Sequence, residues 1–298
     1  MKILITGATG FVGSTLVPLL EVDHELLIVS RNPANARQRL GSQHQYLASL
    51  DQLHHLDDID AVINLAGEPI VAKRWSEQQK EKICHSRWDI TDKLAELINA
   101  SSKPPHTLLS ASAIGYYGRQ GDARLTEDAV PHEEFSHHIC QQWEQKALAA
   151  KSERTRVCIF RIGVVLAAHG GALGKMLPAF KLGLGGPIGD GSQGMSWIHL
   201  RDLLGMILFL LINKECDGVY NATAPLPVSN RDFAKSLGKA LHRPACLPAP
   251  AFALKMALGE MADLLVEGQY IVPKHALDDG YRFQFAKIDD AFAEIFAG

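Results

Sequence analysis

The sequence predicts an α/β protein, in which a doubly wound parallel sheet of the Rossmann type precedes a smaller C-terminal α+β domain. Over the first half of the chain, short runs rich in Ile, Leu and Val alternate with longer amphipathic stretches. Strands that are buried on both faces and covered by helices have this pattern. After Leu166 the alternation gives way to sequence rich in glycine and proline, which marks a change of domain.

The first half contains five strand candidates, at 2–6, 25–30, 61–65, 107–111 and 156–161. Each is a short apolar run with little polar alternation, as expected for the inner strands of a parallel sheet. Helices are expected between them, at 12–20, 76–99 and 133–151. Strand and helix therefore alternate, which favours right-handed crossover connections and a doubly wound sheet.

The second half is divided between the two predicted domains. A helix at 200–212 and a strand at 218–222 are expected to return to the sheet. We therefore predict a Rossmann domain of 1–165 with 200–224, and a small substrate domain of 166–199 with 225–298. The segment 183–194 contains six glycines and one proline. It is expected to act as a mobile lid or, alternatively, to be a static loop of tight turns.

A glycine-rich loop joins the first strand to the first helix, and it reads Thr6-Gly7-Ala8-Thr9-Gly10-Phe11-Val12-Gly13. Its glycines permit a tight turn, close approach of the backbone to a pyrophosphate, and close packing of helix on strand. The helix N-terminus adds free N–H groups and a positive dipole end. This placement predicts a dinucleotide site made by Gly7, Thr9, Gly10, Phe11, Val12 and Gly13.

The end of the second strand indicates which dinucleotide is bound. An acidic residue about 20 positions after the glycines would accept hydrogen bonds from the ribose hydroxyls of NAD. This chain has Ser30 and Arg31 there and no acid. A guanidinium fork and a hydroxyl donor suit a phosphate group, which favours the 2′-phosphate of NADP(H). The alternative is an exposed arginine that simply follows a strand.

These motifs, with Asn64-Leu65-Ala66-Gly67 after the strand at 61–65, resemble the extended short-chain dehydrogenase/reductase superfamily. A more specific set is similar to the YfcH-like epimerase family proteins, which have an NAD-dependent epimerase/dehydratase domain and a C-terminal domain of unknown function. The resemblance covers nearly the whole chain and rests on Gly67-Glu68-Pro69-Ile70, Lys73-Arg74-Trp75, Ser86-Arg87, Gly115-Tyr116-Tyr117-Gly118, Trp143-Glu144, Arg161-x-Gly163-Val164-Val165-Leu166, the glycine run 183–189, Trp197-Ile198-His199 and Glu267-Gly268-Gln269.

The resemblance implies an NADP(H)-binding extended Rossmann fold whose reaction is not generally established. It implies that the backbone at Leu65, Ala66 and Gly67 passes the adenosine side of the cofactor. It also implies that Arg87, on the long helix, reaches the cofactor phosphates. Val165, just after the strand at 156–161, is expected near the nicotinamide.

The usual catalytic residues of the superfamily are only partly present. Typical members have a serine after the strand at 107–111 and a Tyr-x-x-x-Lys about 25 residues later, in which the lysine lowers the pKa of the tyrosine. Ser112 fits the serine, but Ser136 and Cys140 stand near the positions of the tyrosine and lysine. Tyr116 and Tyr117 are the candidates for a replacement acid, and the alternative is that both only pack the loop.

Composition limits the partners and the site chemistry. The net charge of −3 does not favour nucleic acid, and we expect a small-molecule substrate, no membrane partner and an oligomeric state that the sequence does not specify. Five cysteines, odd in number and widely spaced, suggest reduced thiols and a cytoplasmic location. The spacing of His132, His137 and His138 differs from a zincin motif, so no metal site is expected.

Two functions are consistent with these observations. The first is an NADP(H)-dependent oxidoreductase or sugar-nucleotide epimerase-like enzyme acting on a small polar substrate. The second is an NADPH-binding sensor or scaffold without fast catalysis; family labels have linked such proteins to cell division, for which these residues offer no support. The complete cofactor loop favours the first function, and the missing Tyr-x-x-x-Lys favours the second.

Overall fold

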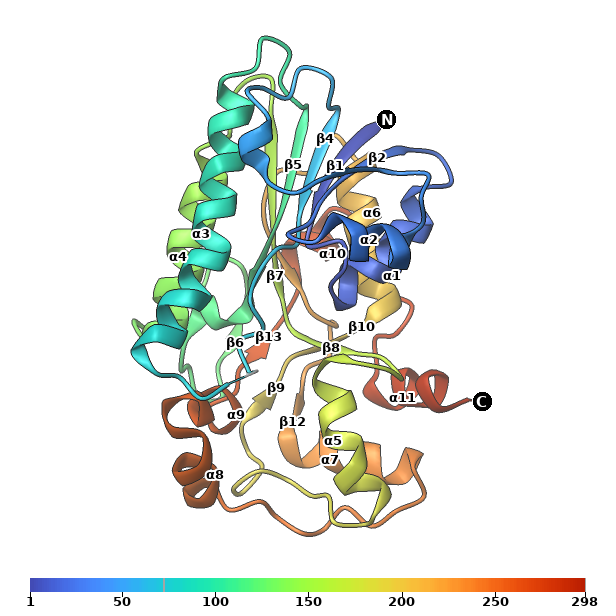
Figure 1. Cartoon of the computed structure of the whole chain (residues 1–298). Helices are drawn as coiled ribbons and strands as arrows, with labels where there is room; N and C mark the ends of the chain where they lie inside the picture. Colours follow the sequence, from blue (N-terminus) through green and yellow to red (C-terminus); the bar gives the residue numbers. More distant parts are fainter. Residues whose placement is uncertain (72, 298) are drawn as a thin grey trace.

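The computed structural model describes residues 1–71 and 73–297. Its centre is a parallel sheet of seven strands in the order β11-β7-β5-β4-β1-β2-β3 (Figure 1). This confirms the predicted Rossmann fold. The strands are β1 (Lys2–Thr6), β2 (Glu25–Val29), β3 (Gln45–Leu47), β4 (Ala61–Asn64), β5 (Thr107–Ala113), β7 (Arg156–Ile162) and β11 (Gly218–Ala222).

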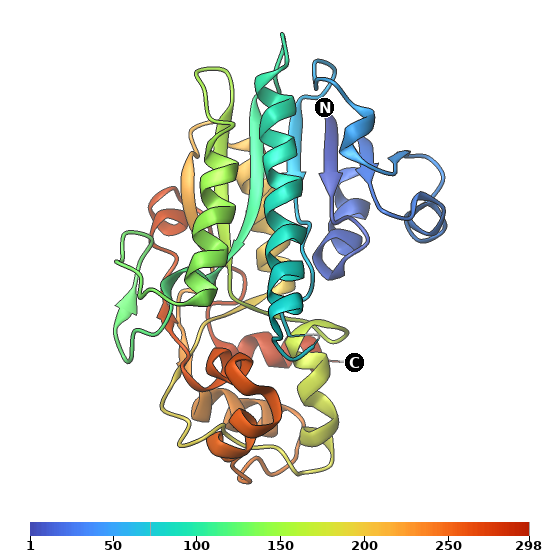
Figure 2. The same ribbon diagram turned by 60° about the vertical axis from the view of Figure 1, so that its left-hand side comes forward.

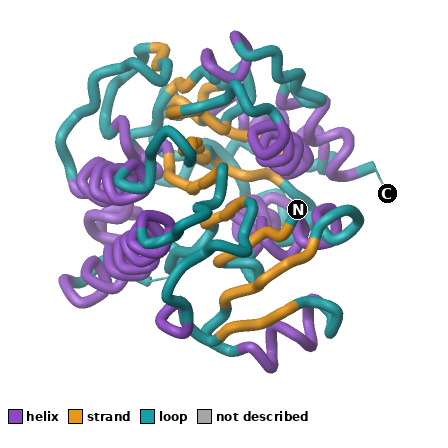
Figure 3. Tube along the Cα trace, turned by 90° about the horizontal axis from the view of Figure 1, so that it is seen from above, coloured by secondary structure: helices purple, strands orange, loops and turns teal. Residues whose placement is uncertain are grey.

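Helices cover both faces of the sheet, as the view from above shows (Figure 3). One layer contains α1 (Phe11–Leu20) and α6 (Leu200–Ile212), and the other contains α3 (Glu77–Asn99) and α4 (Phe135–Leu148). Successive residues of a strand point to opposite faces. In β1, Ile3 and Ile5 pack with the α1–α6 layer, and Leu4 packs with the α3–α4 layer. The absence of polar alternation in the sequence therefore reflects two separate cores.

Beyond the C-terminal ends of the strands lies a smaller unit (Figure 2). Trp197, Phe233 and Phe292 are buried in its core. Trp197 is fully buried. The unit contains α5 (Gly171–Lys181), α7 (Asn230–Ala240), α8 (Ala251–Leu258), α9 (Asp263–Val266) and α11 (Ile288–Phe296), with paired short strands β8 (Val164–Leu166) and β10 (Trp197–His199), and β9 (Gly194–Met195) and β12 (Val228–Ser229).

One segment crosses the predicted domain boundary. We assigned 225–298 to the small domain, but α10 (Lys274–Asp278) packs on β11, and Ala276 and Tyr281 belong to the same core as β1. The Tyr281 hydroxyl donates to the Asp202 carbonyl of α6 at 2.7 Å. Before α10, β13 (Tyr270–Ile271) pairs with β6 (Arg124–Leu125). The last part of the chain thus completes the Rossmann layer, because Ala276 and Tyr281 cover surface that α6 and β11 leave open.

The glycine-rich segment is tied down along its length. Its backbone is hydrogen-bonded to the neighbouring segment, with Leu247 N donating to Gly185 O at 3.2 Å and Gly189 N to Ala249 O at 2.9 Å. A Cβ at Gly186 would collide with the Leu247 carbonyl. Gly194 and Gly268 meet in the same way, since a Cβ on either would collide with backbone of the other segment. These glycines permit close backbone packing, which favours the static alternative over the predicted lid.

The remaining elements are short. They are the helix α2 (Pro33–Leu40) and the 3-10 turns η1 (Leu50–Gln52), η2 (Ile114–Tyr117) and η3 (Gly259–Ala262). Among residues 1–71 and 73–297, no helix combines the length and apolar character needed to cross a membrane.

Candidate functional site

The loop after β1 forms a tight turn against the end of β4. Gly7 has a φ of +70°, and a Cβ there would collide with the Leu65 carbonyl, so both conformation and space require glycine. The Gly10 N–H donates to Gly7 O at 2.9 Å and closes the turn. A Cβ at Gly13 would lie 2.5 Å from Gly7 O, so Gly13 is what lets α1 pack on the loop.

The N-terminus of α1 is open for an anionic ligand. Its N-cap is Gly10, which has no side chain to accept from the first N–H groups, and the first turn holds no acid. Gly10 is exposed, and Thr9, Phe11 and Val12 are half-buried around it. Free N–H groups and the helix dipole together favour a phosphate at this position. The structure therefore brings the six predicted loop residues together in a form that fits a pyrophosphate.

Ser30 and Arg31 lie at the same edge of the sheet, because β2 is the immediate neighbour of β1. The Ser30 hydroxyl is within 3.4 Å of the Asn32 backbone and shapes the turn into α2. Arg31 is exposed and takes part in no ion pair or hydrogen bond among the described residues. Its guanidinium is therefore available to a ligand beside the loop.

Buried polar contacts fix the end of β4. Thr6 Oγ1 donates to Asn64 Oδ1 at 2.7 Å, and Asn64 Nδ2 donates to Thr91 Oγ1 at 2.8 Å, which joins β1, β4 and α3. Leu65 and Ala66 follow, half-buried, and Gly67 is exposed. The backbone at Leu65 and Ala66 therefore lies against Gly7 of the phosphate loop. The contact with the adenosine side of the cofactor that the resemblance implies stays a prediction.

Arg87 holds the turn after β4. It projects from α3, where its two terminal nitrogens donate to Ile83 O at 3.0 Å and Glu68 O at 2.9 Å. A Cβ at Gly67 would lie 3.1 Å from the guanidinium carbon, which itself lies 5.2 Å from the Trp143 ring centre. Burial lowers the pKa of Arg87 from its usual value. Arg87 thus holds the turn after β4 in place, and the contact with the cofactor phosphates that the resemblance implies stays a prediction.

The positions expected for tyrosine and lysine hold a different set of groups on α4. The Ser136 hydroxyl donates to Glu134 Oε1 at 2.6 Å, and Arg119 Nε lies 3.3 Å from Glu134 Oε2. Cys140 is buried, and burial raises the pKa of its thiol to about 12. A neutral thiol cannot replace the lysine cation. Sequence analysis missed Glu134 and Arg119, although Glu134 stands only two residues before the tyrosine position.

Ser112 belongs to a buried ionic network. The residue is 2% exposed, and its hydroxyl donates to Glu144 Oε1 at 2.6 Å. Glu144 also accepts two hydrogen bonds from Arg161, each at 2.8 Å. Burial opposes the charge of Arg161, but the hydrogen bonds and charge of Glu144 outweigh it and raise the pKa of the guanidinium. The catalytic role expected for Ser112 stays a prediction, and its geometry favours a structural role.

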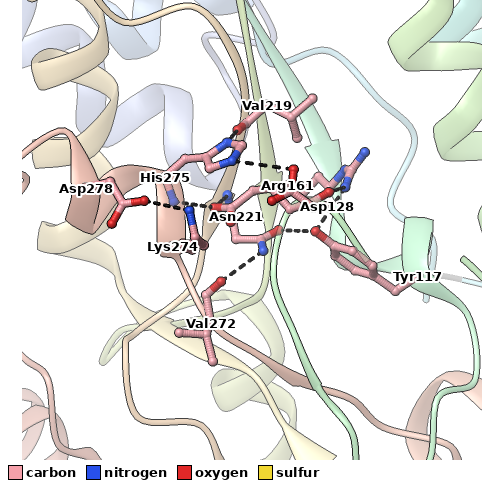
Figure 4. A network of polar contacts seen from close by, with 10 residues as sticks. Tyr117, Asp128, Arg161, Val219, Asn221, Val272, Lys274, His275 and Asp278 are labelled. Atoms are coloured by element: carbon pink, nitrogen blue, oxygen red, sulfur yellow. Dashed lines mark hydrogen bonds and ion pairs between the residues drawn. The ribbon is translucent and has the colours of Figure 1, made fainter. Parts of the chain in front are cut away.

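The two adjacent tyrosines differ in access. The Tyr117 hydroxyl donates to Asn221 Oδ1 at 2.7 Å and accepts from Arg161 at 2.9 Å (Figure 4). It is fully buried, and burial raises its pKa to about 12. Tyr116 is half-buried, with the Arg161 guanidinium 3.4 Å from its ring centre. Its hydroxyl has no hydrogen-bond partner among the described residues and is not one of their buried unsatisfied groups. Only Tyr116 therefore presents a hydroxyl to solvent.

Val165 and the phosphate loop meet at the start of α5. Val165 lies on β8 and pairs with Ile198, and its carbonyl would be 3.1 Å from a Cβ at Gly171. A Cβ at Gly170 would lie 2.8 Å from the Phe11 ring. The glycines that begin α5 thus let the small domain close onto the loop. Among the described residues, no group of three or more His, Cys, Asp and Glu is arranged to hold a metal ion.

Comparison with known proteins agrees with this geometry. A model of the NAD dependent epimerase/dehydratase family matches residues 3–223. The chain belongs to this family. A second model, a domain of unknown function (DUF1731), matches residues 249–295 of the epimerase-family chain. That match covers α8 through most of α11, the region that the sequence assigned to the small domain.

Relatives of the epimerase-family chain come from bacteria, plants and animals. The epimerase family protein YfhF of Bacillus subtilis is 38% identical over 302 residues, covering 100% of this chain and 98% of that protein. The chloroplastic SDR39U1 homolog of Arabidopsis thaliana is 39% identical, covering 99% of this chain and 86% of that protein. The crystal structure of human epimerase family protein SDR39U1 with NADPH is 36% identical, with a TM-score of 0.91 and 100% of each chain covered.

More distant epimerases share the fold with this family member. A UDP-glucuronic acid 4-epimerase from Bacillus cereus, in complex with UDP-glucuronic acid and NAD, has a TM-score of 0.78 at 20% identity. The match covers 100% of this chain and 98% of that one. At this identity the likeness extends to the architecture alone.

Proposed function

We propose that the chain binds NADP(H) and acts as an oxidoreductase or epimerase-like enzyme on a small polar substrate in the cytoplasm. The observation that carries the proposal is the open N-terminus of α1 beside the unpaired Arg31 guanidinium. The first suits a pyrophosphate, and the second suits a 2′-phosphate. Further support comes from a relative, human SDR39U1, whose crystal structure contains NADPH.

The proposed cofactor contacts follow the edge of the sheet. The N–H groups of Gly10 to Gly13 bind the pyrophosphate, and Ser30 with Arg31 binds the 2′-phosphate. The turn at Leu65 to Gly67, braced by Arg87, lies along the dinucleotide, and Val165 packs near its nicotinamide. When bound, NADP(H) would supply a hydride donor or acceptor.

Proton transfer would fall to residues of η2 and α4. A phenol near its ordinary pKa of about 10 needs a neighbouring cation to act as a base at neutral pH, whereas a carboxylate is ionised without help. With Cys140 in place of the lysine, Glu134 is therefore the first candidate for the base, and it already accepts a hydrogen bond from Ser136 at 2.6 Å. Tyr116 is the other candidate, since its hydroxyl faces solvent and a cation, the Arg161 guanidinium, lies 3.4 Å from its ring centre. Tyr117 and Ser112 would hold this site in shape.

Arg31→Ala tests the proposed cofactor. We expect the variant to bind NADPH about ten- to a hundredfold more weakly and NADH nearly as well as the unmodified protein, because one charge-assisted contact to the 2′-phosphate is lost. Titration of both cofactors by fluorescence or calorimetry measures the difference. The control is Arg39→Ala, which removes an exposed arginine from the last turn of α2. Equal losses for NADPH and NADH would contradict the assignment of Arg31.

A second candidate function is an NADPH sensor or scaffold without fast catalysis. It is favoured by the burial of Ser112 and Tyr117, since the hydroxyl of the usual serine and that of one candidate replacement tyrosine are both engaged in the protein interior. The two functions differ in turnover of the bound cofactor. Purified protein with NADPH, given fractionated metabolites, is expected to lose absorbance at 340 nm if the first function is correct. Undiminished absorbance with every fraction, together with intact NADPH binding, would favour the sensor.

A further inference from the structure

An open hollow with a volume of about 530 Å³ lies beside the first turns of α3. All of its lining residues are polar, and they come from the segment 73–76 and from the helix up to residue 85. The small domain adjoins it, since a Cβ at Gly259 of η3 would lie 2.9 Å from Arg74 Nε, and Figure 1 shows this end of α3 close to α8 and α9. The cofactor loop begins α1, in the helix layer on the opposite face of the sheet. The hollow is therefore separate from the proposed pyrophosphate site.

Positive charge predominates in the hollow. Lys73, Arg74 and Lys82 line it, against one carboxylate, that of Glu81. The Lys82 ammonium lies 3.4 Å from a carboxylate oxygen of Glu68. In the part of the chain that the structure describes, Lys73 and Arg74 form no ion pair, and both are exposed. Two cations are therefore available to an anion that enters the hollow.

The start of α3 adds hydrogen-bond donors to these charges. The helix has 23 residues, and its N-cap is Ser76, whose hydroxyl oxygen accepts from the Gln79 backbone N–H at 3.2 Å. The hydroxyl proton of Ser76 is left to donate to a ligand, and the positive end of the helix dipole favours negative charge at this place. The acid of the first turn, Glu77, has a side chain that is 90% exposed and does not line the hollow. The helix end therefore reinforces the preference for an anion.

The Gln79 side chain is an independent observation that points to a ligand. Gln79 lines the hollow but is only 7% exposed. Its Nε2 is buried and has no hydrogen-bond partner among residues 1–71 and 73–297. A buried N–H without an acceptor destabilises a protein, and such a group is usually satisfied by a water molecule or an ion. An oxygen atom of an anion in the hollow would accept from Gln79 and supply the missing partner.

We propose that this hollow binds a small phosphorylated molecule, with the phosphate group held by Lys73, Arg74 and Gln79. A phosphate monoester has three acceptor oxygens, so it accepts from an ammonium, a guanidinium and an amide at the same time. The volume is within the range of small-molecule sites, about 300–1,000 Å³, and leaves room beside the phosphate for the rest of a metabolite. Gln78 and Glu81, which also line the hollow, offer a donor and acceptors to hydroxyl groups of that remainder.

Titration calorimetry with glycerol 3-phosphate and with inorganic phosphate tests the site in the full-length protein. NADPH is added to saturation first, so that the loop before α1 and Arg31 are occupied. We expect one glycerol 3-phosphate to bind per chain, and the double variant Lys73→Gln, Arg74→Gln to weaken it about tenfold or more, because two charge-assisted contacts are lost. The matched control is Lys214→Gln, at an exposed lysine before β11, at the other end of the sheet. No saturable binding, binding of inorganic phosphate alone, or equal affinity in the double variant would each overturn the proposal.

Gln79→Leu separates a role in binding from a role in the fold. Leucine has a similar size but no N–H group, so the variant removes the donor that lacks a partner. We expect the free protein to melt at the same or a higher temperature, and glycerol 3-phosphate to bind severalfold more weakly. A side chain that only stabilises the fold would give the opposite result, a lower melting temperature with unchanged binding. Unchanged affinity in Gln79→Leu would show that the ligand does not reach this residue, and the proposed site would be wrong.

Discussion

Glu144→Gln is expected to lower the free energy of unfolding by about 3–5 kcal/mol. The carboxylate is the sole anionic partner of Arg161 among the described residues, and the two side chains are 7% and 4% exposed. The amide keeps the shape, and its oxygen can still accept from Ser112 and from Arg161 Nε, but its NH2 group replaces Oε2, so one hydrogen bond from Arg161 is lost together with the charge. Arg161 would remain protonated without an anionic partner. The cost of burying its positive charge would then no longer be offset, which destabilises the fold. Urea denaturation measures the loss.

Two further variants show whether the loss comes from leaving a buried charge without its partner. Glu96→Gln removes the carboxylate of an exposed pair, 3.2 Å from Lys93, and is expected to cost less than about 1 kcal/mol. The double variant Arg161→Met, Glu144→Leu removes both charges and is expected to recover part of the loss, because neither is then left alone. A Glu144→Gln protein as stable as Glu96→Gln would show that water reaches Arg161 and that the pair is not a buried one.

Gly10→Val is expected to abolish detectable binding of both NADPH and NADH while the fold survives. Gly10 has a φ of −75° and a ψ of 179°, a conformation that valine adopts readily, so backbone strain is not the reason. The branched side chain would instead stand at the open end of α1, where the pyrophosphate must approach the N–H groups. Titration calorimetry with each cofactor measures the loss, and thermal unfolding checks the fold.

Substitutions at two other glycines distinguish an effect on cofactor binding from an effect on stability. Gly174→Val, on α5, is the matched control, since a Cβ there meets no atom within 4 Å outside its own helix. Gly13→Val should behave differently from Gly10→Val, because it forces a side chain against Gly7 and lowers stability as well as affinity. If Gly10→Val binds NADPH with ordinary affinity, the glycine motif is only a turn and the cofactor lies elsewhere.

The sequence predicts a strand or helix well where the residues of that element alone show a clear apolar pattern. The strands β1 and β7 are rich in Ile, Leu, Val and Phe, and α6 is a long, almost continuously apolar run. In contrast, α2 buries only Ala36, so its eight residues show no periodic apolar face. The strand β3 is only three residues at the edge of the sheet, too short to show a pattern. Helix α5 was missed because its glycines reduce helix propensity, and contact with Phe11 explains why they are there.

The candidate site also has parts that the sequence predicts and parts that it does not. The phosphate loop and Arg31 are local features, in which residues adjacent in sequence act together and the chemistry follows from their order. The network of Ser112, Glu144 and Arg161 joins three elements, with 32 residues between the first pair and 17 between the second. Spacing along the chain contains no information about such a contact. The glycines of 183–194 left both a lid and a static loop open, since glycine content alone does not distinguish flexibility from close backbone packing.

The return of the last segment to the sheet has a consequence for how the protein is made. During synthesis, β11 leaves the ribosome about fifty residues before α10 and Tyr281, which cover it and α6. Until then the nascent Rossmann layer lacks the side chains of Ala276 and Tyr281 in its core, and Asp202 lacks the Gln284 and Phe285 N–H groups that donate to it at 2.7 and 2.9 Å. A chain that stops before α10 therefore lacks part of the core of the cofactor-binding half, and that core is completed only when residues 274–285 have been made.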